Sequence, residues 1–198
     1  MNDKDKTDKI KVPAGCAIVM AGYAGGYRVS LLASRKKDEL QSVFPTFLIR
    51  NALSFGTDVE TGPIRQFLEE AKGMTEIPAV AAVEQGGVFK ALWMLGEEGH
   101  TGFSIEIKKI PIRQETVEIC NYFDINPYRL WSKGPVVFFS KEGERCVHLL
   151  KEKGVEAQII GFTHKENKRV VLSTDEERFL EPRLGDSLDE ISGRKEEE

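Results

Sequence analysis

The residue types that most often ligate metals are scattered along this sequence. The histidines are His100, His148 and His164, and only His148 has a cysteine close by, Cys146. Side chains two positions apart on a helix point about 200° apart, so these two cannot ligate one ion from the same face. The pattern predicts a buried Cys146, an exposed His148 and no metal site.

A catalytic thiol needs a neighbouring base, and Cys120 has no histidine close to it in sequence. It lies beside Ile119 and Phe123, in a stretch whose apolar residues indicate a core position. Burial among apolar side chains raises the pKa of a thiol and makes it inert. We therefore expect Cys120 to be a small core residue, unless the fold brings a histidine to it. The carboxylates are plentiful, but their spacing singles out no acid/base pair, so the sequence predicts no catalytic residue.

Two glycine-rich stretches could contact an anion through their backbone amides. Residues 22–26 lie between two apolar runs that are both predicted strands, which favours a flexible hairpin turn over a phosphate loop leading into a helix. Gly86 and Gly87 follow a predicted strand and open a predicted helix, so their amides could hold an anion. Glu84 has the wrong charge for that role, and close strand–helix packing is the alternative explanation.

The elements that must position these residues alternate between strands and helices, which indicates an α/β fold. Predicted strands cover residues 16–22, 29–33, 77–83, 103–107, 136–139, 157–162 and 169–172. Predicted helices cover 35–52 with an interruption at Pro45, and then begin at Pro63, Val88, Pro111 and Lys141, the last one ending at Gly154. Neighbouring strand pairs at both ends of the chain favour a mixed sheet.

The bulk composition excludes several classes of protein. The chain has 198 residues, of which 40 % are hydrophobic and 30 % charged, a balance typical of a globular domain. Its net charge of −4 argues against a nucleic-acid partner. Three cysteines without a framework spacing, and no apolar run that could target or span a membrane, predict a cytoplasmic protein. We expect charged tails at 1–13 and 184–198 around one domain at 14–183.

Two ordered motifs go further than composition. Ile110-Pro111-Ile112-Arg113 begins a segment that leads to Asn126-Pro127, and the chain closes with Arg178-Phe179-Leu180-Glu181-Pro182. Over about residues 17–191 the sequence resembles AIR synthase-related (PurM/HypE-like) proteins, near a subgroup of hydrogenase maturation factors. The resemblance implies the family's C-terminal domain, an α/β sandwich around a mixed sheet. It also implies that the N-terminal half, which supplies most of the metal and ATP site and the usual dimer interface, is missing.

The family's motif positions have changed in this sequence. Where relatives carry D-x-T-x-G-G, this chain keeps Gly86 and Gly87 but has Ala82 and Glu84 in place of the acid and the hydroxyl. Of the family's G-x-E-G only Gly25 remains, and Arg28 stands where the second glycine would be. The S-x-G motif is kept as Ser132-Lys133-Gly134, and HypE's terminal cysteine has no counterpart. The resemblance thus assigns ligand-binding positions at Gly25, Gly86, Gly87, Ser132 and Gly134.

These changes favour a non-catalytic module over an enzyme. The module would bind no cofactor by itself, and would self-associate or dock on a separately encoded N-terminal-half protein, using Tyr23, Tyr27 and Trp131 if these are not simply packed. Two alternatives remain open. One is an ATP- and Mg²⁺-dependent enzyme of the PurM/HypE kind that a partner completes, and the other is a nucleotide or small-ligand sensor.

Overall fold

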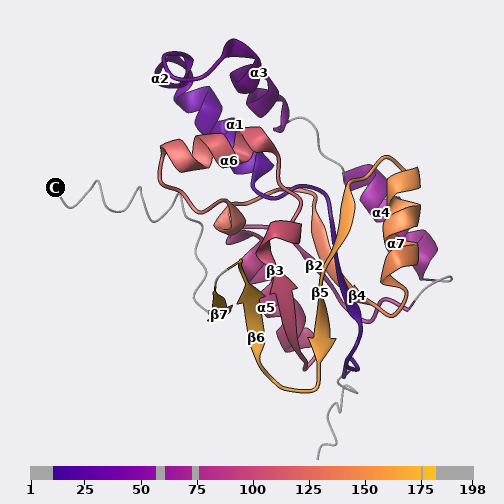
Figure 1. The fold of residues 1–198 in the computed structure, drawn as a ribbon. Coiled ribbons are helices and arrows are strands. Elements are labelled where there is room, and N and C mark those ends of the chain that lie inside the picture. Colours follow the sequence, from indigo (N-terminus) through magenta and orange to yellow (C-terminus); the bar gives the residue numbers. More distant parts are fainter. Residues whose placement is uncertain (1–10, 57–60, 73–75, 175, 182–198) are drawn as a thin grey trace, which may run out of the picture.

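A computed structural model describes residues 11–56, 61–72, 76–174 and 176–181 (Figure 1). The predicted tail at 184–198, and all but the last three residues of the predicted tail at 1–13, lie outside this part of the chain. Val12 is buried, and its amide donates a hydrogen bond to the Gly99 carbonyl at 2.9 Å, so packing reaches back at least to this residue.

The described strands form one mixed sheet, as the sequence predicted. Its order is β2 (Val80–Ala82), β4 (Val136–Ser140), β1 (Ala17–Ala21), β5 (Ala157–His164), β3 (Gly102–Glu106), β6 (Arg169–Leu172) and β7 (Glu177–Phe179). Only β3 and β6 pair in parallel among these strands; the other neighbours are antiparallel.

Strand β1 lies inside the sheet, between β4 and β5, and all five of its residues are buried. Its side chains alternate between the two faces of the sheet. Ile18 and Met20 join one hydrophobic cluster, whereas Val19 and Ala21 join another. A strand that is apolar on both sides must be covered on both sides, and this explains its unbroken apolar sequence.

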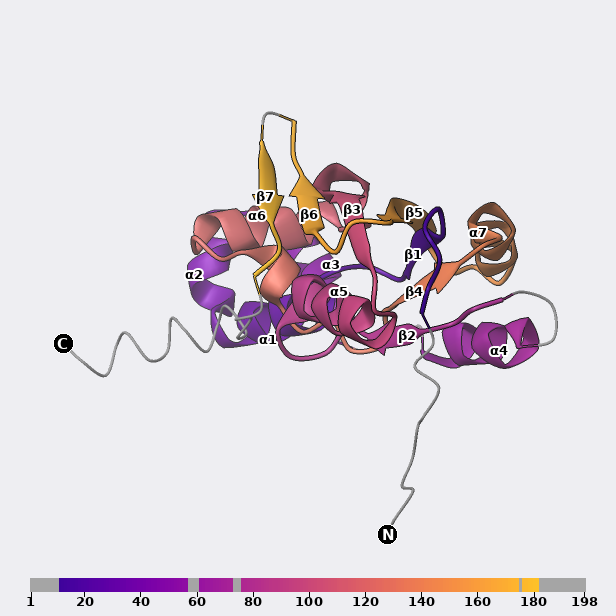
Figure 2. The same cartoon turned by 90° about the horizontal axis from the view of Figure 1, so that it is seen from below.

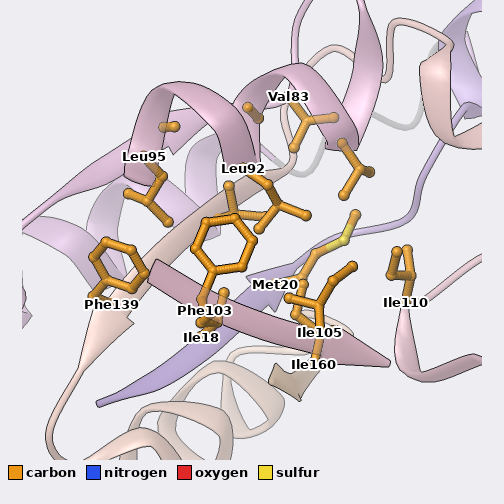
Figure 3. Close-up of a cluster of buried hydrophobic side chains, with 14 of the residues drawn as sticks. Ile18, Met20, Val83, Leu92, Leu95, Phe103, Ile105, Ile110, Phe139 and Ile160 are labelled. Atoms are coloured by element: carbon orange, nitrogen blue, oxygen red, sulfur yellow. The ribbon is translucent and has the colours of Figure 1, made fainter. Parts of the chain in front are cut away.

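Helix α5 (Gly87–Glu98) covers one face of the sheet. Its Leu92 and Leu95 pack against Phe103 and Phe139 of the sheet, as Figure 3 shows. The other face is covered by α4 (Thr61–Ala71) and α7 (Gly143–Glu152), which lie side by side in Figures 1 and 2. The helical stripes predicted from residues 64 and 88 are therefore the faces that cover the sheet.

Four further helices form a cluster at one end of the sheet, at the top of Figure 1. They are α1 (Gly26–Arg35), α2 (Lys37–Gln41), α3 (Thr46–Ser54) and α6 (Gln114–Tyr122). Buried Val29, Leu40, Ile49 and Ile119 supply its core, one from each helix. The predicted interruption at Pro45 is confirmed, because that residue immediately precedes α3.

The prediction of a strand at 29–33 is wrong, because these residues lie in α1. Val29 and Ala33 are buried and one helical turn apart, so the run is the inner face of a helix. A short apolar run does not by itself distinguish a buried strand from a buried helical segment. Residues 22–26 therefore connect a strand to a helix and not two strands.

Several element bounds also differ from the predictions. Helix α6 begins at Gln114 rather than Pro111, because Ile112 forms a parallel bridge with Ala24 and the Pro111 carbonyl accepts from the Ala24 amide at 2.8 Å. Pro63 is the third residue of α4 instead of its first. Strand β7 and the short 3-10 helices η1 (Ile107–Lys109) and η2 (Pro127–Arg129) were not predicted from the sequence.

Candidate functional site

The loop of residues 22–26 connects strand β1 to the start of helix α1. The predicted hairpin turn is therefore wrong, and the loop has the strand-to-helix arrangement that phosphate-binding loops share. Gly25 caps α1 in the left-handed region with φ 74°. Its amide donates a hydrogen bond of 2.8 Å to Ser132 Oγ. Two of the predicted ligand-binding residues, 107 positions apart, thus meet directly.

The turn at Ser132-Lys133-Gly134 connects this loop to the second glycine motif. The Ser132 amide donates to the Val83 carbonyl at 3.3 Å, and the Val83 amide donates to the Pro135 carbonyl at 2.9 Å. Lys133 and Gly134 both have positive φ, at 53° and 120°. All three motif segments that the family resemblance singled out therefore lie together at one end of the sheet.

Gly86 and Gly87 have backbone conformations that favour glycine, and at Gly87 the packing also leaves no room for a side chain. Both have positive φ, at 94° and 68°. A Cβ atom at Gly87 would collide with the Tyr128 carbonyl oxygen and would lie 2.8 Å from Arg129 Cα, both in η2. The Gly87 amide already donates to the Glu84 carbonyl at 2.8 Å. At Gly87 these contacts support the alternative explanation from the sequence, close strand–helix packing.

Gly25 is also confined by the protein. A Cβ atom there would lie 3.0 Å from Thr116 Cγ2 and 3.1 Å from the Pro127 carbonyl oxygen. The left-handed φ adds strain to any larger residue at this position. The need for glycine at positions 25 and 87 thus follows from the packing of this domain alone.

The three altered motif positions have different surroundings. Ala82 is exposed at the end of β2, an edge strand, and pairs with Val136 of β4. Glu84 is exposed in the loop that precedes α5. Arg28 is half-buried in the first turn of α1, where its amide donates to the Trp131 carbonyl at 3.1 Å.

The start of α1 borders a small hollow lined by two cations and two aromatic rings. The Arg113 guanidinium lies between the rings of Tyr23 and Phe55, 4.5 Å and 4.4 Å from their centroids. The Lys133 ammonium lies 4.8 Å from the centroid of Tyr27. Gly26, Ser132 and Pro135 complete the wall, and the hollow has a volume of only about 20 Å³. A larger pocket of about 340 Å³ shares Tyr23 and Arg113 with it and is also lined by Lys151 and Glu156.

Arg113 and Lys133 are the residues that the sequence reasoning missed. Both lie in quoted motifs, but nothing in the local pattern placed either beside the 22–26 loop. Together with the α1 amides they make this corner attractive to an anion. No carboxylate lines the smaller hollow in the described part of the chain.

Cys120, Cys146 and His148 have the surroundings that the sequence predicted. Burial raises the pKa of the Cys120 thiol to about 12, as expected of an inert core cysteine. Cys146 is buried, and His148 is exposed and lies 3.2 Å from Glu152. Within the described residues, no three histidine, cysteine or acidic side chains come together as metal ligands.

The aromatic residues proposed for a partner surface, Tyr23, Tyr27 and Trp131, pack against other side chains of this domain. Tyr27 and Trp131 pack edge to face with centroids 4.9 Å apart, and Tyr23 packs on Arg113. All three are half-buried, as ordinary packing predicts. No helix in the described part of the chain combines the length and the apolar character that crossing a bilayer requires.

The comparisons with known proteins agree with the motif resemblance. No protein-family model matches the sequence. A putative hydrogenase expression/formation protein of Methanocaldococcus jannaschii is 29 % identical over 189 residues, which cover 91 % of this chain and 52 % of that protein. The chain therefore spans about half the length of the curated relative that it matches.

Solved structures share the fold at low identity. HypE of E. coli aligns with a TM-score of 0.72 and 15 % identity, covering 91 % of this chain and 53 % of that one. HypE in complex with ATP aligns with a TM-score of 0.68 and 17 % identity, covering 91 % and 54 %. This chain is thus homologous to a hydrogenase expression/formation protein over about half of that protein, and it has the mixed α/β fold of one portion of HypE.

Proposed function

We propose that this chain acts in hydrogenase maturation as a HypE-like domain that catalyses no reaction by itself and depends on a partner. The name of the M. jannaschii relative supports the biological process. This chain matches only about half of that relative and of HypE, which supports a role that requires additional polypeptide. That protein would be another part of the same polypeptide, a second copy, or a separate chain that supplies an N-terminal half.

The observation that carries the proposal is the methyl group at Ala82. The family motif has an aspartate at this position, where β2 ends and the loop toward Gly86 begins. Ala82 is exposed, so a carboxylate would fit there without rearrangement. A methyl group can neither ligate Mg²⁺ nor accept a proton. Position 82 therefore lacks the carboxylate that could bind a metal or transfer a proton. Packing of the domain accounts for the glycines at positions 25 and 87.

One observation favours a second candidate, a nucleotide or small-ligand sensor. Arg113 and Lys133 lie beside the start of α1, and an anionic ligand needs no catalytic carboxylate to bind there. Such a sensor would bind a nucleotide without turning it over.

Calorimetry with ATP and Mg²⁺, paired with a phosphate-release assay, tests these possibilities. We expect the purified chain to release no phosphate above background. Ala82→Asp should bind ATP–Mg²⁺ more tightly than the parent, because the added carboxylate can ligate the metal. Its exposed position should leave unfolding stability within about 0.5 kcal/mol of the parent. Val80→Asp, on the same edge strand, is the control that adds a charge without restoring the motif.

The outcomes separate the candidates. ATP hydrolysis by the chain alone, unchanged in both variants, would refute the proposal. Heat of binding without hydrolysis, lost in Lys133→Gln, would favour the sensor. Hydrolysis that begins only when a HypE-like N-terminal half is added would identify an enzyme completed in trans. Light scattering on the same samples shows whether a second copy is the partner.

A further inference from the structure

A further cavity lies away from the glycine motifs, at the opposite end of β1. It has a volume of about 840 Å³, which is within the range of small-molecule sites. Three segments surround it: the residues that lead into β1, the end of α5 with the start of β3, and the β5–β6 connection. Figure 1 shows that connection at the bottom, away from the four-helix cluster at the top.

The side chains that line this cavity are mainly cationic or hydrogen-bond donors. Lys11, Lys165 and Arg169 contribute cations, and the imidazole of His100 can donate a hydrogen bond. His164 Nδ1 already donates to the Glu166 carbonyl at 2.8 Å. Each of the three segments supplies at least one of these groups. A ligand bound between them would therefore be surrounded by donors instead of meeting a single charged surface.

Arg169 anchors the wall, and its side chain is only 8 % exposed. Its Nη1 atom lies 2.6 Å from Glu97 Oε1, and its guanidinium lies 4.5 Å from the centroid of Trp93. An ideal Cβ at Gly96 would lie 2.5 Å from Arg169 Nε, so the absence of a side chain at Gly96 makes room for the guanidinium. Within the described residues, Arg169 Nε has no hydrogen-bond partner.

The negative groups nearby are already engaged. Glu97 is the one carboxylate among the described residues lining the cavity, and Arg169 pairs with it. Glu166, on the β5–β6 connection, pairs with Lys168 at 2.9 Å. Carbonyl groups at the end of α5 accept from the Gly99, His100 and Thr101 amides, which reduces the negative end of the helix dipole. Among the described residues that line the cavity, the cations therefore outnumber the carboxylates.

We propose that this cavity binds a small polyanion, a molecule that carries two or more carboxylate or phosphate groups. Arg169 would give a fixed, oriented contact, and Lys11 and Lys165 would close over the ligand from two sides. Charge-assisted hydrogen bonds of this kind are about twice as strong as neutral ones. The site is independent of the function proposed above, because it shares no residue with the glycine-motif corner.

Titration of the untagged protein with citrate, pyrophosphate and neutral glycerol, followed by NMR or calorimetry, tests the proposal. We expect saturable binding of citrate or pyrophosphate and none of glycerol. The preference between the two anions tells whether carboxylates or phosphates are the natural groups. The double variant Lys11→Gln/Lys165→Gln should weaken binding about tenfold, since it removes two of the cations that line the cavity.

The matched control is Lys36→Gln/Lys37→Gln, because it removes two exposed cations at the start of α2, in the four-helix cluster. It should leave citrate affinity within about twofold of the parent. Arg169→Met removes the anchoring guanidinium and should abolish saturable binding; if that variant fails to fold, the lysine double variant at the cavity still decides the matter. The proposal is overturned if neither anion binds saturably at millimolar concentration. It is equally overturned if the control weakens binding while the double variant at the cavity does not.

Discussion

Gly87 illustrates how a motif residue can be retained for backbone packing alone. Its φ is positive, and the backbone of Tyr128 and Arg129 occupies the space where a Cβ atom would lie. The same residue type is found at Gly154, where φ is also positive but no atom lies within 4 Å. The comparison of these two positions separates conformational strain from steric exclusion.

We predict that Gly87→Ala destabilises the domain clearly more than Gly154→Ala. Gly154→Ala should cost about 1 kcal/mol, the strain of a left-handed alanine. Gly87→Ala adds displacement of η2 and should cost about 2 kcal/mol more. Urea unfolding of the two variants measures the difference. Equal losses would mean that η2 moves aside easily and that packing does not explain the glycine.

The buried thiol of Cys120 should make the free energy of unfolding depend on pH in the alkaline range. Its pKa is about 12 in the folded protein, against 9.0 for an ordinary thiol, because burial removes the thiolate from water. Above pH 9.0 the unfolded chain releases this proton while the folded chain keeps it. The stability that this thiol contributes is therefore complete below that pH and is lost as the pH rises toward 12.

Measurements of the unfolding free energy between about pH 8 and pH 11 check this pH dependence. This thiol should lower the unfolding free energy by at most about 1.4 kcal/mol per pH unit. Burial also raises the pKa of Tyr128, so part of the decline will remain when Cys120 is removed. Cys120→Ala should flatten the curve in the lower part of the range. An unchanged slope in that variant would show that Cys120 is not the group responsible.

At the scale of elements, α5 is the helix that covers one face of the sheet. On this helix Leu92 is fully buried against the sheet, whereas Met94 is 55 % exposed. We expect Leu92→Ala to destabilise the protein by about 2–5 kcal/mol and Met94→Ala to stay within about 0.5 kcal/mol. Thermal or urea unfolding measures both. Comparable losses would mean that α5 is less firmly docked than the core packing indicates.

The turn at Ser132 joins the two glycine loops through hydrogen bonds. Its hydroxyl accepts from the buried Gly25 amide, so Ser132→Ala leaves a donor unsatisfied. We expect a loss of about 1–3 kcal/mol. Ser42→Ala removes an exposed hydroxyl that donates to the Glu39 carbonyl, and should cost much less. A Ser132→Ala variant as stable as Ser42→Ala would indicate that the amide finds another acceptor.

At the scale of the whole molecule, the sheet and the four-helix cluster are joined by these same loops. The two tryptophans report on different parts: Trp93 packs against the sheet core, and Trp131 packs on Tyr27 of α1. We predict one cooperative transition, so Trp93→Phe and Trp131→Phe variants, each followed by the remaining tryptophan, should show coincident unfolding profiles. An earlier transition in the Trp93→Phe variant, seen through Trp131, would show that the helical cluster unfolds separately.

The local pattern determined much of the architecture. Apolar periodicity identified α5 and the apolar run of β1, and the mixture of strand pairs indicated a mixed sheet. These features are readable because burial repeats every two residues in a strand and every three or four in a helix. The motif resemblance to AIR synthase-related proteins is likewise confirmed by the homologue and the shared fold. Oligomeric state, cytoplasmic location and the ligand-binding role of the glycines stay predictions.

Only the tertiary structure decided how the motif segments are placed relative to one another. The apolar run at 29–33 is helical because α3 and α6 bury one side of it, and no local signal distinguishes that from a strand. The Gly25–Ser132 bond and the place of Arg113 between Tyr23 and Phe55 join segments far apart in sequence. Such contacts depend on how the chain closes over its core, and periodicity along the chain contains no information about that closure.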